Sequence, residues 1–120
     1  MSLSFRPVKE VWGKHSSCFV DAGLMLRVLL AIATEAGSRG EAYEYGDKTS
    51  IWVEDGGKLI DFICNERLFT AERIARALEL KKAHHLNDLK FLVSNMQILA
   101  DKWRDSIDAH GALTFYIDAY

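Results

Sequence analysis

The residue with the clearest chemical potential is Cys18, which directly follows Ser16 and Ser17 in the stretch KHSSCFVDAG. Serine is a good N-cap, so the pattern predicts a helix that begins at Ser16 or Ser17 and runs to about Ala36. The unpaired N–H groups and the dipole at the start of a helix favour a thiolate, the form of cysteine that acts as a nucleophile. Cys18 is therefore a candidate nucleophile.

The same residue has a second interpretation as a buried structural thiol. On a helical wheel, Cys18 shares one face with Ala22, Met25 and Leu29, and this face would pack against the rest of the protein. Free cysteine is among the residue types that are most often buried. Both interpretations stay open on the sequence alone.

Residues 16–65 resemble the core of the transglutaminase-like cysteine enzymes, which are relatives of papain. The resemblance rests on Cys18 with Ala22 four positions later, on the helix-like run MLRVLLAIATEAG, and on the strand-like runs SIWVE and KLIDF. It implies an enzyme that acts on amide bonds, with Cys18 as the nucleophile and Asp61 as the residue that orients the general base.

One position departs from that family pattern, because Ser50 stands where the family has its catalytic histidine. A serine cannot serve as a general base near neutral pH, so Cys18 would lack its activator. The histidines elsewhere in the chain have no sequence position that assigns them this role; they are His15, His84, His85 and His110. The departure favours a protein without catalytic activity.

Three short runs after the first helix, EAYEYG, TSIWVE and KLIDFIC, are rich in aromatic and β-branched residues. The sequences GDK and EDGGK between them are typical of turns. We therefore predict an antiparallel three-stranded meander over residues 42–64. In this interpretation Asp61 lies on a strand, and Gly56 and Gly57 form a hairpin turn.

Two further helices are predicted after the meander. Thr70 is a suitable N-cap for the first, LFTAERIARALEL. Apolar residues then recur every three or four positions from Leu86 to Ile107, which predicts a long amphipathic helix ending near His110. Neither proline nor glycine separates the two helices, so a single continuous helix stays open.

The two ends of the chain complete the predicted fold. Pro7 suits the first turn of a short helix in FRPVKEVWG, and ALTFYIDAY alternates as a last strand, which joins the meander or pairs with a second subunit. The prediction is one α+β domain over residues 1–120, with a long N-terminal helix, the meander, two further helices and a C-terminal strand.

Aromatic residues on the predicted strands are the second candidate site. Tyr43 and Tyr45 share one face of their strand, Trp52 lies on the neighbouring strand, and Tyr116 lies on the last one. Tyrosine and tryptophan are enriched at protein-binding hot spots, and they also serve to cover a sheet against a helix. A binding surface and ordinary packing are both compatible with this pattern.

Composition narrows the classes of function. The formal net charge of −2, without a basic stripe, argues against nucleic-acid binding, and the longest apolar run is too short to span a membrane. No metal or cofactor motif is present. The two cysteines and the absence of a signal peptide predict a cytoplasmic protein. We expect a small soluble interaction or regulatory module that binds a protein partner or itself, with the cysteine enzyme as the alternative.

Overall fold

The computed structural model confirms an α+β fold in which one antiparallel sheet carries a layer of helices. It describes residues 3–7, 16–18, 22–45, 48–80 and 83–119, with the backbone alone for 3–7, 16–18, 22–26, 45, 48–49, 83–85, 88 and 116–119. The elements in chain order are β1 (Leu3–Pro7), β2 (Ser16–Cys18), α1 (Ala22–Glu35), β3 (Gly40–Tyr45), β4 (Lys48–Val53), α2 (Gly56–Cys64), α3 (Ala71–Ala77), α4 (Ala83–Leu99), the 3₁₀ helix η1 (Ala100–Ser106) and β5 (Leu113–Ala119).

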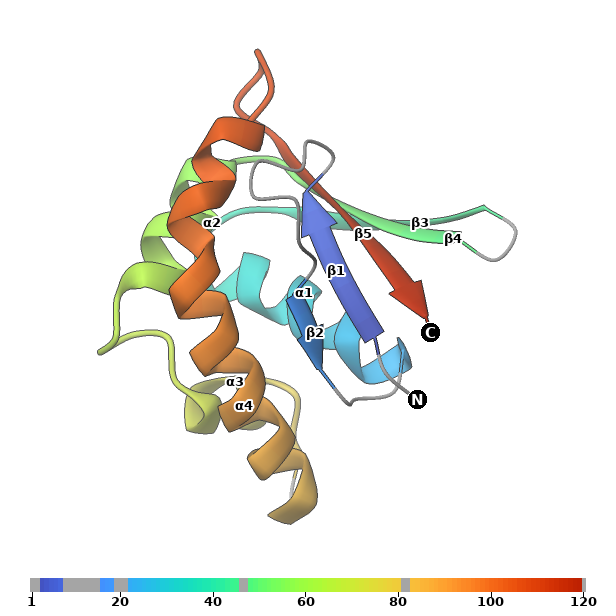
Figure 1. Ribbon diagram of the computed structural model, residues 1–120. Helices are drawn as coiled ribbons and strands as arrows, with labels where there is room; N and C mark the ends of the chain where they lie inside the picture. Colours follow the sequence, from blue (N-terminus) through green and yellow to red (C-terminus); the bar gives the residue numbers. More distant parts are fainter. Residues whose placement is uncertain (1–2, 8–15, 19–21, 46–47, 81–82, 120) are drawn as a thin grey trace.

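The described strands form one sheet in the order β2-β1-β5-β4-β3, and every neighbouring pair is antiparallel (Figure 1). The last strand in the sequence therefore lies in the middle of the sheet. Phe115 of β5 pairs in register with Ile51 of β4 on one side and with Pro7 of β1 on the other. Of the two predicted alternatives for ALTFYIDAY, this chain uses the first, because β5 joins its own sheet.

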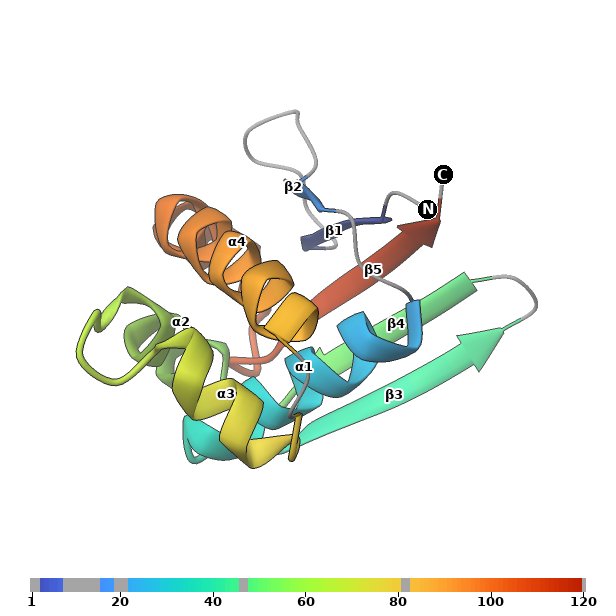
Figure 2. The same cartoon turned by 90° about the horizontal axis from the view of Figure 1, so that it is seen from below.

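The helices cover one face of this sheet. Helix α1 packs against β3, β4 and β5, and α3 packs against both α1 and α4 (Figure 2). Alternate strand residues enter the core between the two layers, and the rings of Trp103 and Phe115 meet edge to face there with centroids 5.1 Å apart. Burying each large apolar side chain contributes about 1.5–3 kcal/mol. The strand residues that are almost fully buried are Ile51, Val53, Leu113 and Phe115.

Helix α1 ends as the sequence predicts, with Gly37 just beyond its last turn. Gly37 has φ +79°, its N–H donates to the Thr34 carbonyl, and the Ser38 N–H donates to the Ala33 carbonyl. This is the Schellman arrangement, which requires a left-handed residue that glycine supplies without strain. The chain can therefore turn directly into β3.

The third strand of the predicted meander is wrong, because KLIDFIC forms helix α2. Asp55 is the N-cap of this helix, and its side chain accepts a hydrogen bond from the Lys58 N–H at 3.0 Å. Leu59 and Ile63, four residues apart, face the core, whereas Asp61 faces solvent. A helix thus places the charged residue outside, which a strand buried on both faces could not do.

The glycine pair that suggested a hairpin turn has a different role. A Cβ on Gly56 would lie 2.8 Å from the Cβ of Leu113 and 3.1 Å from Cγ1 of Ile107, so the start of α2 packs too closely on β5 for a side chain. The Gly56 N–H also donates to the Gly111 carbonyl at 2.8 Å. The glycine allows a close approach between helix and strand.

The beginning of the chain also differs from the prediction. Residues Ser16–Cys18 form the short strand β2 instead of a helix start, and α1 begins at Ala22. Pro7 ends strand β1 instead of opening a helical turn. These short strands depend on pairing with each other and with β5, which local patterns in the sequence do not reveal.

Between α2 and β5, the described residues form two separate α-helices, α3 and α4, followed by η1. Thr70 caps α3 as predicted, because its Oγ1 accepts from the Arg73 N–H at 3.2 Å. Helix α3 ends before Glu79, which has φ +57°, and the Leu80 N–H donates a hydrogen bond to the Ala75 carbonyl. The predicted long helix is α4, which ends at Leu99 and continues only as η1 to Ser106.

Within the part of the chain that the structure describes, none of the helices combines the length and the apolar character that a membrane crossing requires.

Candidate functional site

The face of the sheet opposite the helices carries a row of side chains that stay accessible. We define this open face by the described residues of β4 and β5 that alternate with the buried ones, together with their register partners on β3; they are Glu41, Tyr43, Ser50, Trp52 and Thr114. Tyr43 is 52% exposed, whereas Ile51 on the neighbouring strand is fully buried. In Figure 1, β3 and β4 are seen nearly edge on with α1 beneath them, and no described helix lies on their other side.

Register brings the four predicted aromatic positions onto adjacent strands. Ser50 pairs with Tyr43 on one side and with Tyr116 on the other. Trp52 lies two residues beyond Ser50 along β4, and Tyr45 lies two residues beyond Tyr43 along β3. The backbone positions of all four residues therefore cluster around the middle of β4, although the side chains of Tyr45 and Tyr116 lie outside the described part of the structure.

Charged groups surround the two described aromatic side chains. The Arg39 guanidinium lies over the Trp52 ring, 5.5 Å from its centroid, in a cation–π contact. Its Nε also lies 3.8 Å from a Glu41 carboxylate oxygen and 3.9 Å from one of Glu54. The Tyr43 hydroxyl donates a hydrogen bond to Glu41, and this bond raises the pKa of Tyr43. The phenol is therefore a neutral donor at physiological pH.

The two residues that the family resemblance singles out lie on different kinds of element from those expected. Cys18 lies on β2, where it pairs in register with Leu3. Asp61 lies on α2, and its Oδ1 accepts a hydrogen bond from Arg104 Nη2 of η1 at 2.8 Å. The role of Cys18 as a nucleophile stays a prediction. Asp61, the orienting residue in that resemblance, is bound instead by Arg104 on the surface of the helical layer.

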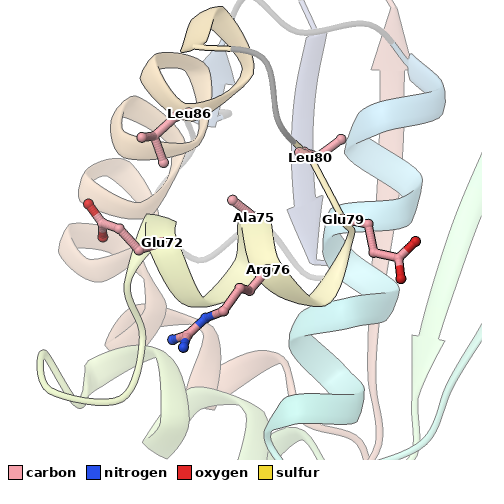
Figure 3. Close-up of a pocket in the computed structure, with 6 residues that line it drawn as sticks. All are labelled: Glu72, Ala75, Arg76, Glu79, Leu80 and Leu86. Atoms are coloured by element: carbon pink, nitrogen blue, oxygen red, sulfur yellow. The ribbon is translucent and has the colours of Figure 1, made fainter.

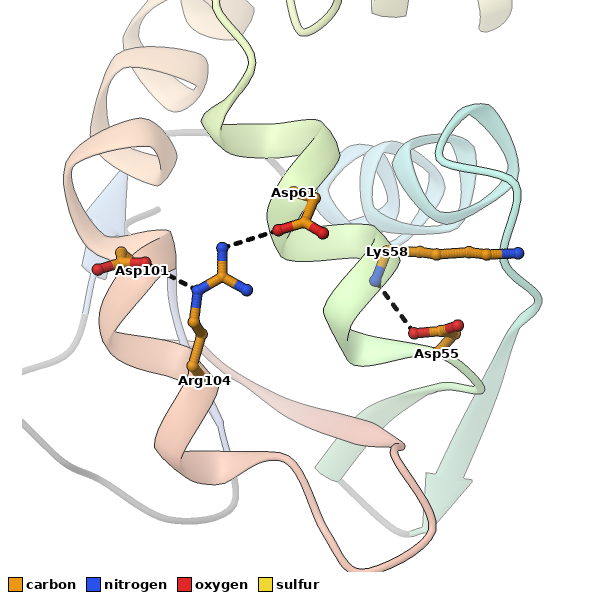
Figure 4. A network of polar contacts seen from close by, with 5 residues as sticks. All are labelled: Asp55, Lys58, Asp61, Asp101 and Arg104. Carbon is orange, nitrogen blue, oxygen red and sulfur yellow. Dashed lines mark hydrogen bonds and ion pairs between the residues drawn. The ribbon is translucent and has the colours of Figure 1, made fainter.

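A polar network around Arg104 is a feature that the sequence did not indicate (Figure 4). Arg104 Nε donates to Asp101 at 2.8 Å and Nη2 donates to Asp61, and these hydrogen bonds, that to Asp101 first, raise the pKa of the guanidinium. Cys64 is a free thiol nearby, and burial raises its pKa while Arg104 lowers it. With a raised pKa, Cys64 is a thiol at neutral pH and a poor nucleophile.

The structure describes the four histidines, which are the remaining candidates for a general base, to different extents. His15 falls outside the described residues, and only the backbone of His84 and His85 is described, in α4. His110 is exposed and, with Asp55 and the α1–β3 turn, lines a polar pocket of about 370 Å³ at the start of α2. The Asp108 carboxylate accepts from the N–H groups of residues 110 and 112, which lowers its pKa and fixes this loop.

A pocket of about 610 Å³ lies between α3 and α4 (Figure 3). Apolar side chains form its floor and charged side chains its rim; the lining residues are Glu72, Ala75, Arg76, Glu79, Leu80 and Leu86. None of the residues predicted from the sequence as catalytic or binding lines it. Size alone therefore does not identify it as the functional site.

Among the described residues, no three His, Cys, Asp or Glu side chains are grouped closely enough to hold a metal ion. Comparison of the chain with models of protein families, with curated proteins and with solved structures found no match. Aromatic, cationic and carboxylate groups come together at two described places. At the first, Arg73 lies over Phe62 and pairs with Glu35, but the Phe62 ring is only 6% exposed. On the open face of the sheet the aromatic group Tyr43 is 52% exposed. The open face is therefore our candidate site.

Proposed function

We propose that this chain is a non-catalytic interaction module that binds another protein through the open face of its sheet. The observation that carries the proposal is the exposure of Tyr43 beside Trp52 on a face that no described helix covers. Tryptophan, tyrosine and arginine are the residue types most enriched at binding hot spots. All three occur here: Arg39 lies over Trp52, and Tyr43 lies two residues from Glu41, the register partner of Trp52.

The chemistry of this surface fits a protein partner. Trp52 and Tyr43 offer rigid rings that can bury a large apolar area at little cost in side-chain entropy. Arg39, Glu41 and Glu54 surround these rings with groups that can exchange their present ion pairs for contacts with a partner. An apolar centre with a polar rim is the usual anatomy of a protein interface.

The other use of strand aromatics, to pack a sheet against a helix, is already fulfilled on the opposite face. There α1 covers Ile51 and Val53, which are at most 1% exposed. Aromatic side chains on the open face are not needed to close this core. The free thiol at Cys64 fits our further expectation that the module works in the reducing cytoplasm.

The proposal is tested by affinity capture from cells that contain the protein, with matched variants as bait. A Tyr43→Ala/Trp52→Ala double variant should lose the proteins that the wild type retains, whereas Phe91→Ala, which removes an exposed ring on α4, should keep them. The dissociation constant of each recovered protein should rise at least tenfold for the double variant. Equal retention by the wild type and the double variant would contradict the proposal.

A further inference from the structure

Strand β3 has a free edge. It is the end strand in the order β2-β1-β5-β4-β3, and in the described part of the chain only β4 pairs with it. Figure 2 shows β3 at the margin of the sheet, next to β4. An end strand presents backbone N–H and C=O groups that can pair with a further strand.

The register identifies which backbone groups face this edge. The Glu54 N–H donates to the Arg39 carbonyl at 2.8 Å, and an antiparallel ladder then alternates, so that the backbone of Glu41 and Tyr43 bonds to β4. The intervening residues direct their N–H and C=O groups the other way. Ala42 and Glu44 are the exposed residues among these, so their backbone groups are available to a second strand.

The edge lacks three of the devices that commonly protect an end strand, which are proline, lysine and a bulge. Its sequence GEAYEY contains no proline and no lysine, and all six residues pair with β4 in one continuous register without a bulge. Its charged residues are the two carboxylates of Glu41 and Glu44, which disfavour an acidic or like-charged strand and leave a basic one free to pair. A regular six-residue edge is long enough to hold an extended peptide segment.

The charge of β3 determines which kind of strand can pair with its free edge. Glu41 and Glu44 make β3 acidic, so a second copy of β3 would bring four carboxylates into one strand pair. Like charges on paired strands are destabilising, whereas opposite charges are stabilising. Resting on the proposed function, we propose that the partner contributes an extended segment with Lys or Arg residues, which pairs with the backbone of Ala42 and Glu44 at the β3 edge.

Phage-displayed random twelve-residue peptides, selected on the full chain, provide the probe. The selected peptides should be rich in Lys, Arg and β-branched residues. Their affinity should fall at least tenfold for Ala42→Pro, which removes the N–H on the free edge and leaves the bonds to β4 intact. The matched control Ala42→Ser keeps this N–H and should stay within twofold of the wild type.

A second pair of variants keeps the test decisive if Ala42→Pro does not fold. Glu44→Lys should weaken the same peptides at least tenfold through repulsion, and Glu44→Gln should weaken them less. The proposal is overturned if no peptide is selected, if the peptides lack basic residues, or if none of these variants weakens binding. A dimer in sedimentation that Ala42→Pro or Glu44→Lys abolishes would also overturn it, because the occupant would then be a second copy.

The open face and the edge can fail separately. Peptides that lose affinity for Trp52→Ala and bind Ala42→Pro and Glu44→Lys normally would support the open-face module and overturn strand addition. Peptides that bind all of these variants equally would count against both.

Discussion

The two faces of one sheet have opposite surroundings, although their residues alternate along the same strands. On β4, Ile51 and Val53 are at most 1% exposed under α1, whereas Ser50 and Trp52, which alternate with them, remain accessible. The covered face gains its free energy from burial, and the open face contributes little to stability. Substitutions on the open face can therefore change binding without changing the fold.

The largest expected effect comes from truncation on the covered face. Ile51→Ala should lower the free energy of unfolding by about 2–5 kcal/mol, because it leaves a cavity beneath α1. Tyr43→Ala on the neighbouring strand should lower it by less than about 1 kcal/mol. Urea unfolding measures both, and equal losses would break the distinction between the two faces.

A smaller effect is expected where α2 meets the covered face. Gly56→Ala should cost about 1–3 kcal/mol because the new Cβ would overlap Leu113. Gly57→Ala is the matched control, since a Cβ added there would lie 3.4 Å from its nearest neighbour, the Asp55 carboxylate, which is an ordinary contact distance. A neutral result for Gly56→Ala would show that the packing between α2 and β5 is loose.

The surface network around Arg104 should matter less than either apolar contact. Arg104→Gln breaks two ion pairs between side chains that are 43–78% exposed. Such pairs contribute about 0–1 kcal/mol and are screened by salt. Unfolding at low and high salt should show a small difference that shrinks as salt rises, and a loss as large as that of Ile51→Ala would refute this ranking.

The smallest effect is a change in pH dependence at Asp108. The carboxylate accepts hydrogen bonds from backbone N–H groups, which lower its pKa in the folded state. The contribution of Asp108 to the free energy of unfolding is therefore complete above its unfolded pKa of about 4. This contribution is lost as the pH falls through the lower folded pKa. Asp108→Asn should keep the loop but lose less stability than the wild type between pH 5 and pH 2. Parallel acid-unfolding curves would contradict this assignment.

The cysteine enzyme suggested by the family resemblance has its own test. In a Cys64→Ser variant, only Cys18 can react with iodoacetamide. Fast labelling of the native protein, with an apparent pKa well below the value of about 8.5 for a free cysteine, would support a nucleophile. A Cys18 that reacts only after denaturation would rule this activity out.

The sequence predicted the elements whose signals are local. Thr70 as a cap, Gly37 as a helix end and the strand in ALTFYIDAY are decided by a few neighbouring residues, and all three are confirmed. The prediction of a strand in KLIDFIC is wrong because a stretch of seven residues with five apolar ones fits a strand or a short helix equally well. The two glycines before it are typical of a turn, whereas in the structure Gly56 is required by its contact with Leu113, which is distant in sequence.

The candidate site was predictable in its residue types but not in its position. Tyr43, Tyr45, Trp52 and Tyr116 were correctly assigned to strands, yet which face they occupy depends on the register with β5 and on where α1 packs. These contacts join residues far apart in the chain. For the same reason, the free edge of β3 follows only from the complete strand order.

Photo-cross-linking from single positions tests the central claim most directly. A benzophenone amino acid replaces Tyr43 on the open face in one protein and Ile98, an exposed residue of α4, in another. Irradiation in cells should produce a discrete cross-linked protein from position 43. An excess of wild-type protein without the benzophenone should abolish this product, and position 98 should not yield it. A discrete product from position 98 with none from position 43 would contradict the assignment of the open face as the binding surface.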